Sequence, residues 1–499
     1  MPVILTPDSQ RLLAALAIAL LYMAFCLLVV LRERRRRRHW VPEADDTAPA
    51  LLIAHASQTG FAEELAWRSA EALRASGLAA RVAELGTLTA ETLAAGGTAL
   101  FVVSTTGEGD APDSAARFLR KVMTGTPDLS RLRFGVLALG DSSYTQYCAF
   151  GRRLDDWLRE CGGRPLFDRV EVDNGDEEAL RRWQDHLRRL AGAADLPVWS
   201  APRFGKWRLV ERRLLNPGSQ GSPAFHLALE PCEDAPHWCA GDIAEIGPRN
   251  SAAAVRAFAE RLGIDAVEEL EERSLPHEPA AIAALAGLPP DELLQRLPPL
   301  PHREYSIASL PEDGRLELLV RQMRHPDGRL GIGSGWLTAH VPVGGCIALR
   351  VRTNRSFHPP EPDRPMILVG NGTGMAGLRA HLRARRAAGQ YRNWLIFGER
   401  SRAQDFFYRE EIEAWLADGS LQRLDLAFSR DQAERVYVQD RLREAADDLR
   451  RWVTAGAAIY VCGSLEGMAG GVHAALADIL GADTLEELTE GGRYRRDVY

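Results

Sequence analysis

Two short clusters of this sequence carry residue types that bind phosphate and stack on flat rings. Ser57-Gln58-Thr59-Gly60 directly follows an apolar run that fits a buried strand. Placed at the start of a helix, its hydroxyls and amides would cradle a phosphate without any cation. Arg303-Glu304-Tyr305-Ser306 offers a fork-shaped phosphate donor, a flat aromatic face and a hydroxyl. We therefore expect two different ligands that each combine a ring with a phosphate.

Length and composition narrow the class of protein. A chain of 499 residues suggests roughly three domains of about 100 to 200 residues each. Its 46% hydrophobic and 26% charged residues fit a packed globular body, and a net charge of -7 argues against nucleic-acid binding. The 7 cysteines include no CxxC pair and no zinc-type spacing, so we expect neither a disulfide framework nor a metal site.

The N-terminal residues have the pattern of a membrane anchor. Residues 12–31 form an uncharged apolar run, long enough for a bilayer core of about 30 Å, and an arginine run follows at 34–38. A cleaved signal peptide, the alternative, has its positive charge before the apolar run. We expect residues 1–31 to hold a single span, most simply in a bacterial inner membrane, and residues 32–49 to form a basic flank and tether. The positive-inside rule then leaves the C-terminal catalytic body in the cytoplasm.

Strands and helices alternate from residue 50 to about 197, which predicts a doubly wound parallel sheet. In such sheets ligands bind beyond the carboxyl ends of the strands. The polar loops 57–62, 104–110 and 140–147 all fall at that edge.

The sequences SQTG, STTGEGD and GDSSYTQYC in these loops resemble the FMN-binding flavodoxin domain of NADPH-dependent diflavin reductases. Thr106 stands where microsomal cytochrome reductases carry an aromatic residue, so the chain is more similar to the sulfite reductase flavoprotein. The resemblance implies FMN contacts from Ser57, Gln58, Thr59, Gly60, Ala62, Ser104, Thr105, Thr106, Gly107, Gly109, Gly140, Asp141, Tyr144, Tyr147, Cys148 and Asp173.

The next region reads as short strands, 207–229 and 241–246, interrupted by a helical stretch at 252–297. The strands suit a barrel, and the helical stretch resembles a shortened connecting region of diflavin reductases or is a simple lid. The REYS cluster resembles the RxYS element of the ferredoxin:NADP reductase family, and residues 331–337 resemble its second FAD loop. This implies FAD contacts from Arg303, Tyr305, Ser306, Gly333, Ser334, Gly335, Trp336 and Tyr499.

A new strand–helix pattern starts near residue 365 and carries a third set of motifs. A glycine-rich loop at 372–374 opens a helix, a geometry that binds diphosphate. The block from 429 to 439 resembles the 2′-phosphate pocket of NADPH-dependent diflavin reductases, and Asn371, Gly377, Ser464 and Gly471 depart from the family pattern. The implied NADPH contacts are Gly372, Thr373, Gly374, Arg379, Ser429, Arg430, Arg435, Tyr437, Gln439 and Cys462.

Catalytic residues are implied at the end of the chain. The family places a cysteine beside the nicotinamide, here Cys462, although a buried core thiol is the alternative. Asp497 and the terminal Tyr499 resemble the end of sulfite reductase flavoproteins, where the last aromatic covers the FAD ring. With Ser306 they would assist hydride transfer by polarity and position.

We expect an α/β multidomain protein with one N-terminal transmembrane helix, a flavodoxin-like FMN domain and a ferredoxin:NADP reductase-like module. The expected ranges are 50–197 for the FMN domain, 198–360 for a β-barrel FAD domain with its insertion, and 361–499 for a Rossmann-like NADPH domain. The predicted enzyme passes electrons from NADPH to FAD, FMN and an acceptor, for which we favour a membrane hemoprotein or a metal-reducing partner. A sulfite reductase flavoprotein subunit is the main alternative, and a non-catalytic flavin-binding sensor is a third.

Overall fold

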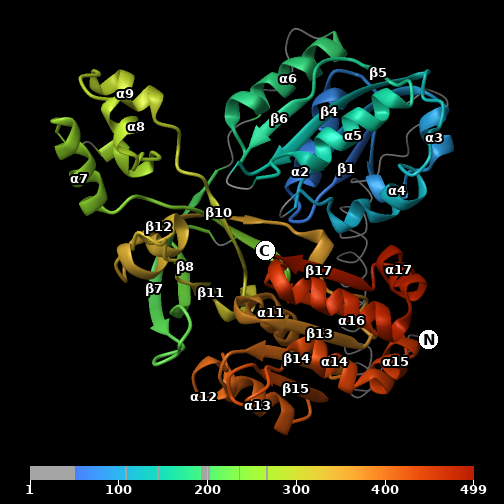
Figure 1. The fold of residues 1–499 in the computed structure, drawn as a ribbon, viewed down its shortest axis with the longest axis vertical. Helices are drawn as coiled ribbons and strands as arrows, with labels where there is room; N and C mark the ends of the chain where they lie inside the picture. Colours follow the sequence, from blue (N-terminus) through green and yellow to red (C-terminus); the bar gives the residue numbers. More distant parts are fainter. Residues whose placement is uncertain are drawn as a thin grey trace, which may run out of the picture. The chain divides into compact units, whose positions relative to one another are not determined.

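The computed structural model describes residues 51–106, 109–142, 145–192, 199, 203–234, 236–265 and 268–499. All of them lie in one unit, Leu51–Tyr499, which contains three successive sheets within the described residues (Figure 1). The predicted anchor at 12–31, its basic flank and the tether lie outside the described residues. In the part of the chain that the structure covers, no helix is long and apolar enough to span a bilayer.

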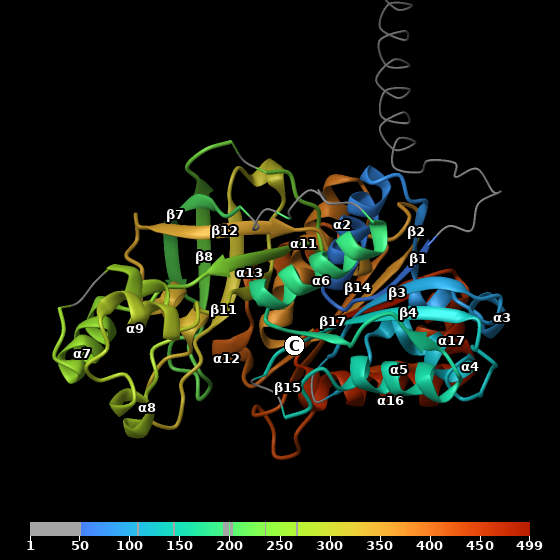
Figure 2. The same ribbon diagram turned by 90° about the horizontal axis from the view of Figure 1, so that it is seen from above.

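The first sheet is parallel, with strand order β2-β1-β3-β4-β5 and β6 paired to β4. Its strands are β1 (Leu51–Ala56), β2 (Ala80–Glu84), β3 (Gly97–Ser104), β4 (Leu132–Gly140), β5 (Arg164–Pro165) and β6 (Val170–Asp173). One face is covered by α2 (Phe61–Ala75) and α6 (Glu177–Ala191) (Figure 2). The other is covered by α3 (Ala90–Ala94), α4 (Ala116–Lys121) and α5 (Ala149–Glu160). Apolar cores on both faces confirm the predicted doubly wound sheet.

The second sheet is antiparallel, with strand order β10-β9-β12-β7-β8-β11. Its strands are β7 (Gly205–Leu214), β8 (Ala224–Pro231), β9 (Ile243–Gly247), β10 (Arg303–Ser306), β11 (Leu316–Arg321) and β12 (Cys346–Arg352). A bridge between Ile307 and Leu318 joins its two end strands and closes a barrel around an apolar core. This closure places the REYS cluster on β10, at the barrel wall.

The helical stretch between β9 and β10 has a small core of its own, which includes Val255, Phe258 and Leu270. Its helices are α7 (Ala252–Leu262), α8 (Pro279–Ala283) and α9 (Pro290–Arg296), with a 3₁₀ turn at Glu268–Glu272. The hydroxyl of Ser251 begins α7 by accepting from Ala254 N at 3.2 Å, and Gly263 ends it with a φ of 67°. The stretch is therefore a separately packed insertion.

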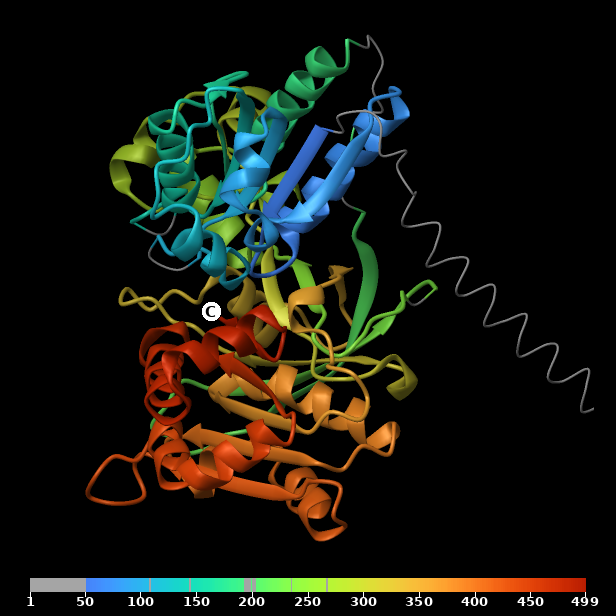
Figure 3. The same cartoon turned by 90° about the vertical axis from the view of Figure 1, so that its right-hand side faces the viewer.

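The third sheet is parallel, with strand order β15-β14-β13-β16-β17. Its strands are β13 (Met366–Asn371), β14 (Asn393–Glu399), β15 (Arg423–Phe428), β16 (Ala458–Gly463) and β17 (Tyr494–Val498). One face is covered by α11 (Met375–Ala387), α12 (Arg402–Asp405) and α13 (Arg409–Ala417). The other is covered by α14 (Val438–Glu444), α15 (Ala446–Thr454), α16 (Gly470–Leu480) and α17 (Ala482–Glu490). The C-terminus, at the end of β17, lies between the two parallel sheets (Figures 1 and 3).

Candidate functional site

The loop between β1 and α2 is a tight, cation-free turn at the carboxyl end of the first sheet. Gly60 precedes α2 with a φ of 84°, a conformation that favours glycine. The hydroxyl of Ser57 accepts a hydrogen bond from Ala62 N at 3.2 Å, so the loop folds over the start of its own helix. The half-buried Thr59 adds a second hydroxyl. Hydroxyls around a helix N-terminus fit a phosphate.

The loop after β3 carries an unsatisfied buried hydroxyl. Thr106 Oγ1 is buried and has no hydrogen-bond partner among the described residues. The backbone of Thr106 pairs with that of Asp110, and Gly109 has a φ of 106°. A Cβ atom at Gly109 would lie 2.8 Å from Gln146 Cβ, so this loop closes on the loop after β4. A buried hydroxyl without a hydrogen-bond partner, in a loop that closes tightly at a glycine, fits the polar atoms of a ring ligand such as FMN.

The loops after β4 and β6 are tied together. Asp173 accepts a hydrogen bond from Ser142 N at 2.9 Å. The thiol of Cys148 donates to Ala138 O at 3.4 Å, and burial raises the pKa of Cys148 to about 11. Cys148 therefore packs beneath the loop as a neutral thiol.

The remaining predicted FMN residues lie on or beside the same strands. Ser104 ends β3, Thr105 Oγ1 accepts from Phe150 N, Gly140 ends β4, Asp141 follows it, and Tyr147 is half-buried. Gly107 and Tyr144 lie outside the described residues.

The two predicted FAD elements meet at Gly333. A Cβ atom at Gly333 would lie 2.7 Å from both Arg303 Cγ and the Tyr305 hydroxyl, so only glycine fits there. The short α10 (Ile332–Gly335) leads into a π-helical turn at Trp336–His340. Trp336 Nε1 is buried without a partner among the described residues, and Ser334 Oγ accepts from Met323 N at 3.0 Å. The orphaned indole N–H and the Arg303 fork fit an anionic dinucleotide such as FAD.

The backbone of the glycine loop after β13 packs directly against the backbone of β16, with no room for a side chain between them. Cβ atoms at Gly370 and Gly374 would lie 2.4 Å and 2.0 Å from Cys462 O. Asn371 Oδ1 accepts from Ser464 N at 2.9 Å, so two residues that depart from the family pattern bind each other. Gly372 has a φ of 54°, and the loop continues into α11. Backbone amides at a helix start, here on the half-buried Gly372 and Thr373, fit a diphosphate.

The predicted 2′-phosphate residues gather beyond β15. Arg430 and Arg435 are exposed, and neither pairs with a carboxylate of the described residues. Ser429 N donates to Glu399 O at 2.9 Å, which ties this loop to β14. Tyr437 is 42% exposed, and Gln439 lies against Gly471 on α16. Free guanidinium groups beside hydroxyls fit a dianionic phosphate.

Arg379 occupies a different environment from these arginines. Its guanidinium donates to Ala308 O at 2.8 Å, to Glu317 at 2.5 Å and to Glu411 at 2.5 Å. Arg379 is 6% exposed, and its guanidinium carbon lies 4.4 Å from the centroid of the Tyr408 ring. The donors of Arg379 are thus already used to join α11 to the barrel, and its contact with NADPH stays a prediction.

Three polar side chains from three different strands converge where the barrel meets the third sheet. Ser306 Oγ on β10 donates to Asp497 Oδ2 at 2.8 Å, and Cys462 Sγ lies 3.7 Å from the same oxygen. Cys462 is fully buried and Asp497 is 4% exposed. Burial raises the pKa of Asp497, against the opposing effect of the Ser306 hydrogen bond, and burial also raises that of Cys462.

Tyr499 closes this cluster at the chain end. Its backbone N donates to Gly463 O at 3.1 Å, and its hydroxyl donates to Thr373 Oγ1 at 3.2 Å. Tyr499 as a whole residue is 54% exposed, while its hydroxyl is held by Thr373. The structure therefore brings together the four predicted catalytic residues, Ser306, Cys462, Asp497 and Tyr499, with Thr373 of the glycine loop.

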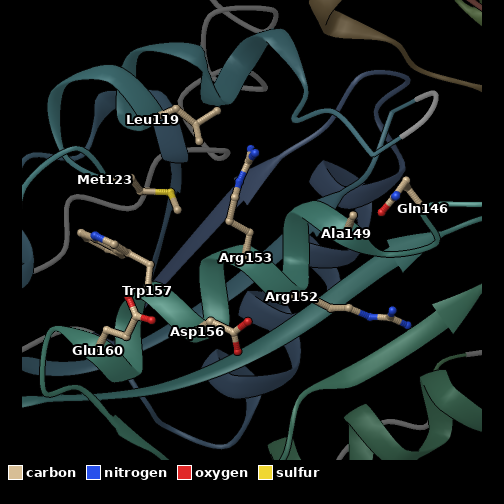
Figure 4. A pocket seen from close by; sticks show the side chains of 9 residues that line it. All are labelled: Leu119, Met123, Gln146, Ala149, Arg152, Arg153, Asp156, Trp157 and Glu160. Atoms are coloured by element: carbon tan, nitrogen blue, oxygen red, sulfur yellow. The ribbon is translucent and has the colours of Figure 1, made fainter.

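A groove in the described residues lies away from these clusters. A groove of about 640 Å³ runs between α4 and α5 and is lined by Leu119, Met123, Gln146, Ala149, Arg152, Arg153, Asp156, Trp157 and Glu160 (Figure 4). Its arginines and carboxylates are mixed, and it holds neither a glycine loop nor an orphaned donor. We assign no cofactor to it.

Comparisons with known proteins agree with this geometry. The flavodoxin family model matches residues 53–183, and the oxidoreductase NAD-binding domain model matches residues 368–474. The chain is 32% identical to the sulfite reductase [NADPH] flavoprotein alpha-component of Neisseria meningitidis serogroup C, over 90% of this chain and 89% of that protein. It is 30% identical to the protein of the same name from Vibrio cholerae serotype O1, over 90% of this chain and 87% of that protein.

The fold and the site define an NADPH-dependent flavoprotein oxidoreductase, which uses FMN, FAD and NADPH. The chain belongs to the diflavin reductase family. The predictions of enzyme class and cofactors are confirmed.

Proposed function

We propose that this enzyme is the flavoprotein component of a sulfite-reductase-type system, which passes electrons from NADPH through FAD and FMN to a separate hemoprotein. The observation that carries the NADPH-oxidising part of the proposal is the cluster of Ser306, Asp497 and Cys462 near Tyr499. The full-length similarity to proteins named sulfite reductase flavoprotein supports this acceptor over the membrane acceptor that we favoured from the sequence.

When bound, FAD would supply hydride chemistry toward NADPH, and the two flavins would supply one-electron chemistry toward an acceptor. The protein's own residues would hold and orient the partners of that transfer. Arg303 and the 331–337 loop would bind the FAD diphosphate, and Arg430 and Arg435 the 2′-phosphate. The buried Ser306–Asp497 pair would keep a fixed hydrogen bond at the reacting edge and exclude water. Tyr499 would leave its place when nicotinamide enters.

The test is a reconstitution with a sulfite-reducing hemoprotein. The purified full chain is supplied with NADPH, sulfite and a siroheme-containing reductase subunit, and sulfide is measured. We expect sulfide to form only with both proteins present. Rapid flavin reduction by NADPH without any sulfide would remove the sulfite-reductase proposal and keep the diflavin reductase.

A second candidate acceptor is favoured by one feature of the sequence, the apolar run 12–31 with its following arginines. We propose on this ground that the chain is anchored in a bacterial inner membrane, with residues 50–499 cytoplasmic, and that a membrane hemoprotein or metal reductase takes the electrons. Affinity purification from mild detergent tests this alternative. Co-purification of a membrane hemoprotein that the enzyme reduces would support it, and recovery of soluble partners alone would exclude it.

A further inference from the structure

Strand β17 serves two sites at once, because neighbouring side chains of a strand point to opposite sides. Asp497 faces Ser306 at the hydride-transfer cluster. Its neighbour Arg496 faces the flavodoxin-like sheet, where Arg496 Nε donates to Asp113 Oδ2 at 2.6 Å and a second guanidinium nitrogen binds the other carboxylate oxygen. Figure 3 shows the chain end between the two parallel sheets.

The side chain of Gln58, in the predicted phosphate loop, takes part in the same contact through both its amide nitrogen and its amide oxygen. Gln58 Nε2 donates to Arg496 O at 2.9 Å, and Gln58 Oε1 accepts from Asp113 N at 3.3 Å. The side chain is only 9% exposed. Both ends of the amide are therefore occupied by β17 and Asp113, although the sequence predicted a contact with FMN.

The backbone of the phosphate loop is also held from outside the flavodoxin-like sheet. Ser356 Oγ donates to Gln58 O at 3.0 Å. A Cβ atom at Gly60 would lie 2.6 Å from Thr353 O. The outer side of the loop thus rests on residues 353–356, which follow the barrel, and on β17.

We propose that Gln58 and Arg496 are positioning residues that hold the phosphate loop in its FMN-binding form, so that the reductase module completes the FMN site. This rests on the proposed assignment of the 57–62 loop to FMN. The free energy of FMN binding then includes the contacts of β17, because a loop already held in shape loses less conformational entropy when the ligand binds.

Equilibrium dialysis of the full chain tests this inference. The protein is depleted of FMN and dialysed against FMN, and the retained FMN and FAD are quantified separately. We expect Gln58→Met and Arg496→Gln each to raise the Kd for FMN about tenfold, since each removes hydrogen bonds to a charged or buried group. FAD content should not change. Arg496→Lys, which retains one ion pair, should lie between Arg496→Gln and the parent.

The matched control is Arg493→Gln, because Arg493 precedes β17 and its guanidinium donates to Val453 O at the end of α15 and to Ala457 O just before β16. It should retain FMN like the parent. The exchange Asp113→Arg with Arg496→Asp should recover most of the affinity that either single change removes. An unchanged Kd for FMN in both Gln58→Met and Arg496→Gln would overturn the inference.

Ser57→Ala separates this inference from the site on which it rests. If Ser57→Ala weakens FMN binding and Gln58→Met does not, the loop binds FMN and the positioning role is wrong. If all three changes leave the Kd unaltered, the loop is not the FMN phosphate site, and both proposals fail.

Discussion

The two parallel sheets each lead from a strand through a glycine loop into a helix, yet they present opposite chemistry to a phosphate. The loop after β1 offers hydroxyls and amides and no cation, and residues 353–356 cover it. The loop after β13 offers amides as well, but cations lie beyond β15, where Arg430 and Arg435 are exposed and unpaired with any described carboxylate. The cations around the first loop, Arg355 and Arg496, are paired with Glu63 and Asp113, whereas those of the second site are exposed and unpaired among the described residues.

The difference between the two loops fits a cofactor that remains bound, FMN, and a coenzyme that dissociates after each reaction, NADPH. A covered loop whose nearby cations are paired binds through many short hydrogen bonds, which salt screens weakly. An unpaired cation cannot be buried at low cost, so the arginines stay hydrated and attract phosphate by charge. Arg379 shows the converse, because its burial is accompanied by Glu317 and Glu411.

The largest expected effect concerns the exposed arginines beyond β15. Replacing Arg430 and Arg435 together by Ala should lower kcat/KM for NADPH about 100-fold and leave that for NADH nearly unchanged, since each charge-assisted hydrogen bond contributes about 1.5 to 3 kcal/mol. Steady-state kinetics with both coenzymes measure the ratio of kcat/KM for NADPH to kcat/KM for NADH. Arg451→Ala, an exposed arginine on α15, is the control. Equal losses with NADPH and NADH would show that the arginines do not read the 2′-phosphate.

A second difference between the sheets is the buried carboxyl at the end of β17. Asp497→Asn preserves the shape and the hydrogen bond to Ser306, and we expect it to slow reduction of FAD by NADPH roughly 30-fold. Stopped-flow absorbance measures the rate, and Asp425→Asn on β15 is the control. A normal rate in Asp497→Asn would restrict this carboxyl to a structural role.

The same change should alter the pH dependence of stability. Burial raises the pKa of Asp497 in the folded chain, so the folded state holds this proton more tightly than the unfolded state. Its contribution is most favourable below the ordinary aspartate pKa of about 3.9 and is lost as pH rises through the raised value. Asparagine has no proton to lose, so Asp497→Asn should remove that loss of stability. The Tm of the variant minus the Tm of the parent should therefore increase as pH rises.

The sequence was sufficient for the glycine loops and the buried strands, because these depend on local residue types. The predicted alternation of strands and helices from residue 50 is present, with α2 (Phe61–Ala75) directly after the SQTG loop. The sequence did not single out β2 or β17, since the charged ARVAE and YRRDV runs form edge strands that lack a continuous apolar pattern. Arg496 was missed for the same reason, and its only signal was its place beside Asp497.

Gln58 illustrates a limit of a different kind. The motif SQTG predicts a phosphate loop, but the direction of the Gln58 side chain depends on Arg496, 438 residues away. The same holds for Asp113, whose carboxylate binds Arg496 on β17. Contacts between distant elements carry no local sequence pattern.

A comparison of Gly60 with Gly77 tests whether residues 353–356 shape the loop after β1. Gly60 and Gly77 have φ of 84° and 88°, so Ala at either position costs about 1 to 2 kcal/mol of backbone strain. Only Gly60 also meets Thr353 O, and nothing lies within 4 Å of a Cβ at Gly77. Gly60→Ala should therefore weaken FMN binding about tenfold, and Gly77→Ala should lower Tm alone. Equal FMN retention in the two variants would show that residues 353–356 do not shape the loop.

The smallest expected effect uses salt to compare the two sites without any substitution. Raising ionic strength from about 0.05 M to about 0.5 M shortens the screening length and should raise KM for NADPH about threefold, because Arg430 and Arg435 act from solvent. FMN retention should change less, since the Gln58 and Ser356 ties to its loop are neutral hydrogen bonds and the Asp113–Arg496 pair is partly buried. Sodium sulfate and sodium chloride at equal ionic strength separate screening from competition by a divalent anion for the arginines. If FMN were lost with salt before KM for NADPH rose, the Asp113–Arg496 pair would hold the loop after β1 by charge, and the contrast between the two phosphate sites would be wrong.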